Sequence, residues 1–503
     1  MIESVIFFFS GSGMVMLFIL FMRINVVGSK SKLVKHRSKE PGFVDLLIYA
    51  SVVDEGVIVG KDGSLMAAWA YQGVDSNSST EAERDQVSLQ INHALSRMGS
   101  GWMIHIDAVR KPAPGYSTKD DSHFPDPVSA AIDEERREFF ERVGTLYESN
   151  YVITATYLPP LLAQQKFVEL MFDDEGVPVD SKTRTIALLN HFKRECANIE
   201  SHLSSVFRMK RLKGKTITKE DNSSVNYDAF LRWIQFCISG LDHPVILPKN
   251  PIYLDALLSG QEFWGGVVPK IGQNFIQVVS IEGFPLASSP GLINSLADLP
   301  CLYRWSTRFI FMDTHEAVGH LEKFSKKWKQ KIRSFFDQVF NSHSSNVDQN
   351  AINMVSDAQA AIAETNSGEV AQGYYTSVVV LMSESRGDLE ASARQVAKAI
   401  NHLGFAARIE TINTIDAYLG SLPGHGVENV RRPLLNTMNL ADLMPSNTVW
   451  PGKNEAPCPM YPPMAPPLMH CTTQGATPFR LNLHVRDLGH TFMFGPTGAG
   501  KST

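Results

Sequence analysis

The stretch GVIVGKDGSLMAAWAY, at residues 56–71, sets the fold class of the first half of the chain. It holds two apolar runs on either side of Asp62-Gly63. Such a pair is typical of a tight turn, because glycine tolerates a positive φ. The stretch therefore predicts a β-hairpin, and the segments that follow decide what covers it.

The residues after the hairpin alternate between helical and strand patterns. Thr80 and Glu83 have the spacing of a capping box, and Gly99 can end the helix that they begin. A hairpin followed by alternating helices and strands indicates an α/β or α+β arrangement. The patterns predict a helix over 80–98, a strand over 102–109, a helix over 127–149 and a strand over 151–158.

A second set of elements is expected further along the chain, and no fixed-period repeat is visible. The mixture of apolar strand runs and longer helical patterns extends the mixed α/β character to residue 420. The expected helices cover 181–212, 227–239, 314–365 with a break near 342–346, and 388–403; the expected strands cover 277–281, 303–312 and 374–382.

Length and composition bound the class of protein. The 503 residues suffice for three or four domains, and 44% hydrophobic with 20% charged residues indicates a globular chain. The net charge of −5 argues against a uniformly basic nucleic-acid binder. Five widely spaced cysteines without C-x-x-C exclude a zinc ribbon and indicate a reducing compartment, where we expect them to be buried apolar groups.

The N-terminus has the pattern of a membrane anchor. Val5 to Met22 carries no charge and spans about 27 Å as a helix, just enough to cross a bilayer core. Only Glu3 precedes it, whereas several basic residues follow it. The positive-inside rule therefore predicts a single-pass helix with the body of the protein in the cytoplasm. A cleaved signal peptide and a buried core helix are the alternatives. The basic residues that follow are Arg23, Lys30, Lys32, Lys35, Arg37 and Lys39.

A proline-rich stretch divides the rest of the chain from its last residues. Residues 444–467 hold eight of the 27 prolines, so they should form neither a helix nor a central strand. We expect an extended connector between domains; a long surface loop of one domain is the alternative. The expected division is an anchor (1–24), a basic segment (25–41), two α/β regions (42–240 and 241–435), the connector (436–475) and the start of a P-loop domain (476–503).

The motif that indicates chemistry is GPTGAGKS, at 495–502, which matches G-x-x-x-x-G-K-[ST]. Glycines let successive N–H groups face phosphate oxygens, a lysine adds charge for the β- and γ-phosphates, and a serine hydroxyl can ligate Mg²⁺. We expect strands at 479–485 and 491–494 before the loop. The expected ATP-binding residues are Gly495, Pro496, Thr497, Gly498, Ala499, Gly500, Lys501, Ser502 and Thr503, with Ser502 as the Mg²⁺ ligand.

The sequence given stops at Thr503, where the helix after a P-loop would begin. The later strand with a Mg²⁺-ligating carboxylate and a catalytic glutamate are also missing from it. As given, the chain is therefore expected to bind nucleotide weakly or not at all and to be inactive by itself. No catalytic residue can be named.

Three other segments have weaker signals. FIFMD, at 309–313, resembles a Walker B strand but precedes the P-loop, so we expect a buried strand with an acidic cap. His315 and His320 are five residues apart, whereas a zinc-binding helix needs four. The basic runs at 208–215 and 326–333 are expected to be solvated faces, with anionic lipid or nucleic acid as the alternative partner.

Several long stretches resemble the CagE/TrbE family of type IV secretion ATPases. They are RLNLHVRDLGHTFMFGPTGAGKST at the C-terminus, and residues 43–73, 83–110 and 122–140 near the N-terminus. The resemblance implies that the chain is the N-terminal portion of an ATPase at the bacterial inner membrane. That ATPase would power pilus assembly and the export of DNA or protein. The resemblance also implies a RecA-like motor, hexamer-type assembly and contacts with other secretion subunits.

Two other hypotheses remain open at this point. A truncated chain could act as a catalytically inactive, membrane-anchored assembly subunit of the same secretion system. A DNA-pumping ATPase of the coupling type also has an anchor and a P-loop, although such proteins have a smaller region between them. Direct contact with nucleic acid also stays open, although nothing further in the sequence supports it.

Overall fold

A computed structural model of the chain describes residues 42–74, 79–159, 179–218, 224–248, 252–285, 287–339, 349–428, 431–473 and 475–498. Its contacts divide the chain into two units, residues 1–47 and 48–503. In the first unit, the described residues form the short helix α2 (Phe43–Leu46). The anchor predicted at 1–24 lies outside the described residues, and within them no helix has the length and apolarity to cross a bilayer.

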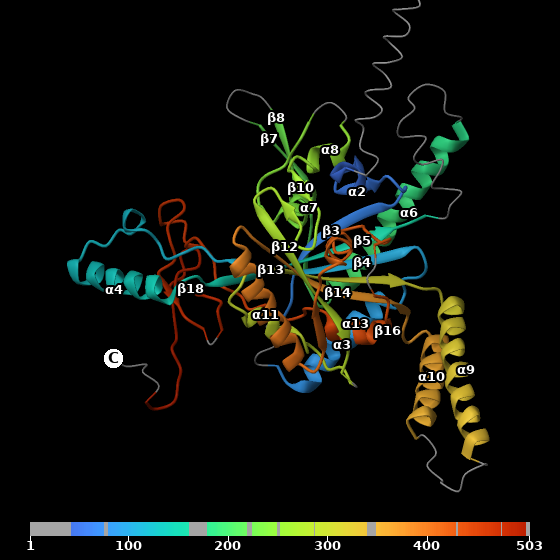
Figure 1. Cartoon of the computed structure of the whole chain (residues 1–503). Coiled ribbons are helices and arrows are strands. Elements are labelled where there is room, and N and C mark those ends of the chain that lie inside the picture. Colours follow the sequence, from blue (N-terminus) through green and yellow to red (C-terminus); the bar gives the residue numbers. More distant parts are fainter. Residues whose placement is uncertain are drawn as a thin grey trace, which may run out of the picture. The chain divides into compact units, whose positions relative to one another are not determined.

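A large sheet organises the second unit (Figure 1). Among the described residues, thirteen strands join it, and all their pairings are antiparallel. The mixed α and β character is therefore confirmed. The main path runs β1 (Tyr49–Asp54), β2 (Val57–Gly60), β3 (Leu65–Gln72), β5 (Tyr147–Tyr157), β4 (Trp102–Pro112), β13 (Tyr303–Phe311), β14 (Gln372–Ser383), β12 (Asn274–Gly283), β11 (Lys270–Ile271) and β10 (Phe263–Trp264).

The hairpin predicted within residues 56–71 is present as β2 and β3. Gly63 has φ +80°, and the Asp62 carboxylate accepts hydrogen bonds from the Ser64 amide (3.0 Å) and hydroxyl (2.6 Å). Helix α3 (Glu81–Leu95) follows with the expected capping box, in which Thr80 and Glu83 bond each other's amides. Local turn and cap chemistry therefore predicted this region correctly.

Two predicted helices were too long. Helix α4 (Pro127–Val143) ends at Gly144, which has φ +83°, and strand β5 begins at Tyr147, inside the range predicted as helix. The helix predicted at 181–212 stops as α6 (Val179–Leu203), and residues 208–211 form strand β6 instead. Strand β6 pairs with β3, so partnering in the sheet outweighs the good helix propensity of its arginine, methionine and lysine.

The remaining strand and helix predictions hold in outline. Strands β12, β13 and β14 cover the three predicted strands, and helices α9 (Thr314–Val339) and α10 (Gln349–Ser367) lie side by side (Figure 1). The break predicted at 342–346 lies outside the described residues. The other elements are α7 (Ala229–Ser239), α8 (Leu254–Leu258), α11 (Arg386–His402), α12 (Thr414–Leu419), α13 (Thr437–Leu443), β6 (Arg208–Arg211), β7 (Gly214–Thr218), β8 (Ser224–Asp228), β9 (Ile246–Leu247), β15 (Ala406–Ile409), β16 (Leu434–Asn436), β17 (Met469–Cys471), β18 (Phe479–Leu481) and the 3₁₀ turns η1 (Lys119–Asp121) and η2 (Asn294–Asp298).

One hydrophobic cluster runs along the sheet. It joins Trp69 and Ile91 in the first half to Phe309 and Val396 in the second, all fully buried. Strands β4 and β13 are neighbours in the sheet, with Arg304 opposite Val109 and Arg308 opposite His105. The two halves of the chain therefore meet at the centre of the sheet, where charged residues occupy positions that are usually apolar.

Candidate functional site

The glycine-rich loop is described only as far as Gly498. Residues 495–498 are exposed, and a turn begins at Thr497. Gly498 has φ +83°, and no atom lies within 4 Å of the place where a Cβ would stand. This is the open, glycine-dependent backbone that a phosphate loop needs. Ala499, Gly500, Lys501, Ser502 and Thr503, five of the predicted site residues, lie outside the described residues.

The strands expected before the loop are shorter than predicted. Strand β18 covers only Phe479–Leu481, and no strand forms over residues 491–494. Phe492, Met493 and Phe494 are 83%, 72% and 89% exposed, so the apolar run has no neighbouring strand within the described residues. A β-strand needs a partner for its backbone groups, which explains why propensity alone was misleading here.

The proline-rich stretch is held against the sheet. Residues 444–467 contain neither helix nor strand, as predicted, and all of them are described. The carbonyl of Pro445 accepts a hydrogen bond from the Tyr71 hydroxyl (2.9 Å), and that of Asn447 accepts one from the Tyr151 hydroxyl (3.0 Å). The Gly73 amide donates to the Thr448 hydroxyl (2.8 Å). We call residues 445–481 the strap; residue 474 within it is not described.

Arg480 bonds the C-terminal end of the strap to the sheet. It is 2% exposed and forms an ion pair with Glu148 of β5. Its amide donates to the Pro451 carbonyl (2.8 Å), which brings the two limbs of the strap together. Gly452 has φ +81°, and a Cβ there would lie 2.2 Å from the Arg480 carbonyl oxygen. Only glycine fits at this crossing.

A second arginine meets the strap from strand β4. Arg110, 1% exposed, donates from Nη1 to the hydroxyls of Thr477 (2.9 Å) and Ser149 (3.1 Å). Next to it, the Tyr147 amide donates to the Ala476 carbonyl (2.8 Å). Burial lowers the pKa of Arg110. The strap is thus bonded to the ends of β4 and β5 through both side chains and backbone.

His470, on strand β17, packs against helix α4. Its ring centroid lies 4.9 Å from that of Tyr116 and 5.8 Å from that of Phe140. Burial, aided by the nearby Arg480 charge, lowers the pKa of His470 to about 4. The imidazole is therefore neutral near pH 7 and acts as a packing group between the strap and α4.

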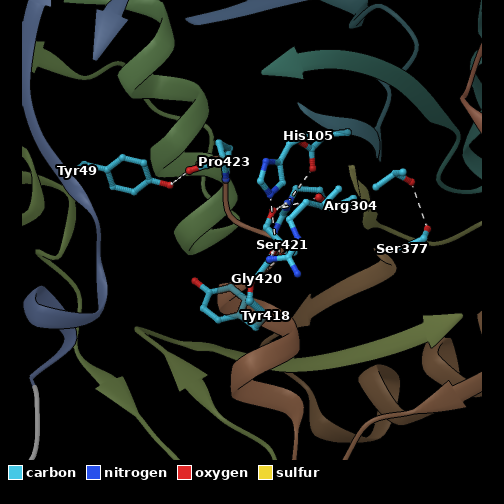
Figure 2. Close-up of polar contacts among 12 residues, drawn as sticks. Tyr49, His105, Arg304, Ser377, Tyr418, Gly420, Ser421 and Pro423 are labelled. Carbon is cyan, nitrogen blue, oxygen red and sulfur yellow. Dashed lines mark hydrogen bonds and ion pairs between the residues drawn. The ribbon is translucent and has the colours of Figure 1, made fainter. Parts of the chain in front are cut away.

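A separate polar cluster lies at the centre of the sheet (Figure 2). Arg304 of β13 donates to the Asp107 carboxylate of β4 at 2.8 Å, and the two residues are 4% and 0% exposed. The same guanidinium donates to the carbonyl (2.8 Å) and hydroxyl (2.6 Å) of Ser421. Burial raises the pKa of Asp107, and the Arg304 charge opposes that shift.

Arg308 extends this cluster towards the loop at 420–428. Its Nη1 donates to the carbonyls of Gly420 (3.3 Å), His425 (3.0 Å) and Glu428 (2.6 Å). Burial lowers its pKa to about 10. His105 lies beside it, 3.4 Å from the Gly420 carbonyl, and burial followed by the Arg308 charge lowers the pKa of His105 well below its usual value. These bonds fix the loop onto the sheet.

The central cluster has no room for a substrate. The cavity beside Arg308 measures about 10 Å³, which suffices for one water molecule. Nε and Nη2 of Arg308 have no protein partner among the described residues, so such a water would have donors to bind. The cluster therefore stabilises the sheet and its loop, and the glycine-rich loop remains the candidate for binding.

Other sequence predictions can be placed directly. Phe309 is fully buried in β13, and the Asp313 carboxylate accepts a hydrogen bond from the Ser100 amide (2.9 Å). The segment at 309–313 is thus a buried strand with an acidic cap, as predicted. Burial also raises the pKa of Cys196 to about 12 and that of Cys301 to about 11, so both thiols are protonated packing groups.

Sequence reasoning missed the arginines that organise these regions. A signal was present: Asp107 and His105 are two apart on β4, and Arg304 and Arg308 are four apart on β13. Residues with an even spacing share a face of a strand, so charges repeated in this way predict a polar stripe. Arg480 gave no such signal, because its strand has three residues.

Two family models match the chain. Residues 56–165 match the N-terminal domain of the type IV secretion system ATPase VirB4/TrbE, and residues 215–431 match the CagE, TrbE, VirB family, a component of the type IV transporter system. Neither match includes the strap or the glycine-rich loop. The matched regions do include the sheet centre and its arginine cluster.

Curated relatives extend the similarity. The conjugal transfer protein TrbE of Rhizobium radiobacter is 47% identical over 470 residues, which is 93% of this chain and 57% of the relative. Two separate chains of Sinorhizobium fredii, both described as probable conjugal transfer protein TrbE, also match. The first is 49% identical over 25% of this chain and 84% of its own length; the second is 48% identical over 62% of this chain and 47% of its own length. The chain spans about half the length of the longer relatives it matches.

Proposed function

Because the chain belongs to the CagE, TrbE, VirB family of type IV transporter components, we propose that it forms part of the ATPase component of a conjugal transfer apparatus. It would bind ATP at residues 495–502 and power pilus assembly and the export of DNA or protein. The observation that supports this most directly is the 47% identity to a conjugal transfer protein over 93% of the chain.

The residues of the loop fit a nucleotide. Gly498 is exposed in a positive-φ conformation with open space at its Cβ position, as a loop that curls around phosphate oxygens requires. Gly495 and Gly500 would allow the loop to curl, Lys501 would contact the β- and γ-phosphates and Ser502 would ligate Mg²⁺. ATP bound there supplies the phosphoanhydride whose hydrolysis powers transport.

The proposed setting follows the family resemblance. The chain would be held at the bacterial inner membrane by a single helix within residues 1–24, with its body in the cytoplasm. Residues 42–240 and 241–435 would dock on other secretion subunits, and 436–475 would lead to the RecA-like domain that starts at 476. Self-assembly of the hexamer type belongs to this proposal.

A catalytically inactive assembly subunit is the second candidate. The observation that favours it is the apolar run at 492–494, which has no strand partner in the described structure. A P-loop whose preceding strand is unpaired would be poorly ordered for phosphate binding. In that case the strap and the sheet would serve only as a scaffold.

Nucleotide binding distinguishes the two candidates. A fluorescent ATP analogue is titrated into the full chain with Mg²⁺, and we expect Lys501→Ala to weaken binding at least about tenfold by removing a phosphate contact. Lys453→Ala, which changes an exposed lysine of the strap, is the matched control and should bind as the parent does. Binding that is undetectable in the parent, or equal in Lys501→Ala, would favour the scaffold.

A further inference from the structure

Helix α4 has two sides of different character. Asp133 and Phe140 are buried, and they contact Tyr116 in the loop before the helix. A separate stripe, about 60° wide at 3.6 residues per turn and centred about 100° away around the helix, is apolar and solvent-exposed. It consists of Val128 (65% exposed), Ile132 (49%), Phe139 (44%) and Val143 (41%).

The bonds of α4 to the rest of the molecule are few. In the described structure, its hydrogen bonds, ion pairs and ring contacts outside the helix reach residues 116–119 and Asp126 of its own preceding segment and His470 of the strap. His470 is 8% exposed and touches both Tyr116 and Phe140. The strap therefore provides the described support of α4 from outside its own segment.

The glycine-rich loop is joined to the same strap. After Leu481 the chain is almost entirely exposed, and a described hydrogen bond that returns it to the body runs from the Arg486 amide to the Pro457 carbonyl (2.8 Å). Pro457 itself belongs to the strap. If residues 482–494 move, the movement thus reaches the strap first and reaches the sheet through the strap.

Resting on the proposed nucleotide binding, we propose that the strap is a coupling element between the glycine-rich loop and helix α4. Arg480, held by Glu148 and Pro451, is its pivot, and His470 is its contact with α4. When the strap is docked, α4 is fixed with its apolar stripe outward; when the strap is displaced, α4 loses that support. The apolar stripe of α4 therefore takes one of two positions, depending on whether nucleotide is bound at the glycine-rich loop.

The coupling has a physical basis in the free energy that is lost when part of the strap separates from the sheet. The side chains of Arg480 and Glu148 are 1% and 15% exposed, so separating them leaves a buried charge without its partner. The β17–β18 hairpin, in which His470 pairs with Arg480, should therefore turn about Arg480 as one piece with the ion pair intact. Two discrete positions of this kind are what an allosteric connection between two sites requires.

Amide hydrogen exchange of the full chain tests the pivot without nucleotide. In Arg480→Ala we expect exchange at least about tenfold faster both in residues 469–481 and in α4, because the strap supports the helix. The matched control is Arg408→Ala, which removes an exposed ion pair to Glu282 and should leave α4 unchanged. Helix α11, which the strap does not touch in any described bond, reports global loosening.

A second variant keeps the test valid if Arg480→Ala does not fold. His470→Ala removes the ring contacts and leaves the ion pair, so exchange should quicken in α4 but not in the Arg480 backbone region. Unchanged exchange of α4 in both variants would overturn the coupling. Since no nucleotide is added, this outcome is distinct from a failure of the proposed ATP binding, which the titration above measures separately.

Discussion

The centre of the sheet and the end of the strap both bury an arginine against a carboxylate, yet they are held differently. Arg304 lies on a nine-residue strand between two long neighbours and also bonds Ser421 twice. Arg480 lies on a three-residue strand with one partner strand. The same pair of groups therefore belongs to the global fold in one place and to a local, separable contact in the other.

The largest effect should come from the centre. Arg304→Ala leaves the fully buried Asp107 without its counter-charge, and we expect the free energy of unfolding to fall by about 3–5 kcal/mol. Urea denaturation followed by circular dichroism measures it. A loss below about 1 kcal/mol would mean that the centre tolerates an unpaired carboxylate and that the comparison is wrong.

Arg480→Ala should cost less and act locally. The partner Glu148 is 15% exposed and can be hydrated after the change. We therefore expect the substitution to destabilise the strap by about 2 kcal/mol. Limited proteolysis should then cut near residues 445–481 while the sheet core remains intact. Unfolding of the whole protein at the same urea midpoint as in Arg304→Ala would contradict the distinction between the two regions.

Gly452→Ala tests how tightly the two parts of the strap cross. The positive φ and the 2.2 Å approach to the Arg480 carbonyl leave no space for a methyl group, and about 1–2 kcal/mol of local destabilisation is expected. Gly115→Ala is the matched control, because its position is open and has no positive φ. Equal protease sensitivity of the two variants would show that the crossing at Gly452 is not tight.

The smallest effect concerns pH and His470. Its pKa of about 4 in the folded state is below the usual value, so the unfolded chain takes up the proton first as pH falls. Stability should be fully present above about pH 6.5 and decline towards pH 4 by about 1 kcal/mol, because contact of the ring with water reduces the roughly 3 kcal/mol that the full shift would give. His470→Phe should flatten this region of the profile; an unchanged slope would assign the acid sensitivity to other groups.

Much of the fold was predictable because local chemistry decides it. The Asp62-Gly63 turn and the Thr80–Glu83 box each involve residues within a few positions of one another, and the structure has both. Strand β6 was missed because its partner β3 is about 140 residues away. The run at 492–494 was wrongly predicted as a strand for the same reason, since a strand is defined by a neighbour.

The candidate site also has one part that could be predicted from the sequence and one part that could not. GPTGAGKS was recognisable because every residue of a phosphate loop acts through its own backbone or side chain at fixed spacing. The strap was not, because Arg480 and Glu148 are 332 residues apart and neither belongs to a motif. Contacts made between distant segments leave no periodicity in a single sequence.

Hydrogen exchange of the unmodified chain, without nucleotide and with Mg²⁺ and ATP at a concentration that saturates a weak site, shows whether the glycine-rich loop is coupled to α4. We expect slower exchange in residues 495–503 when ATP is present, together with altered exchange in the strap and in α4. Slower exchange at the loop alone would remove the coupling and leave the ATP site. No change at residues 495–503 would contradict the proposed function itself.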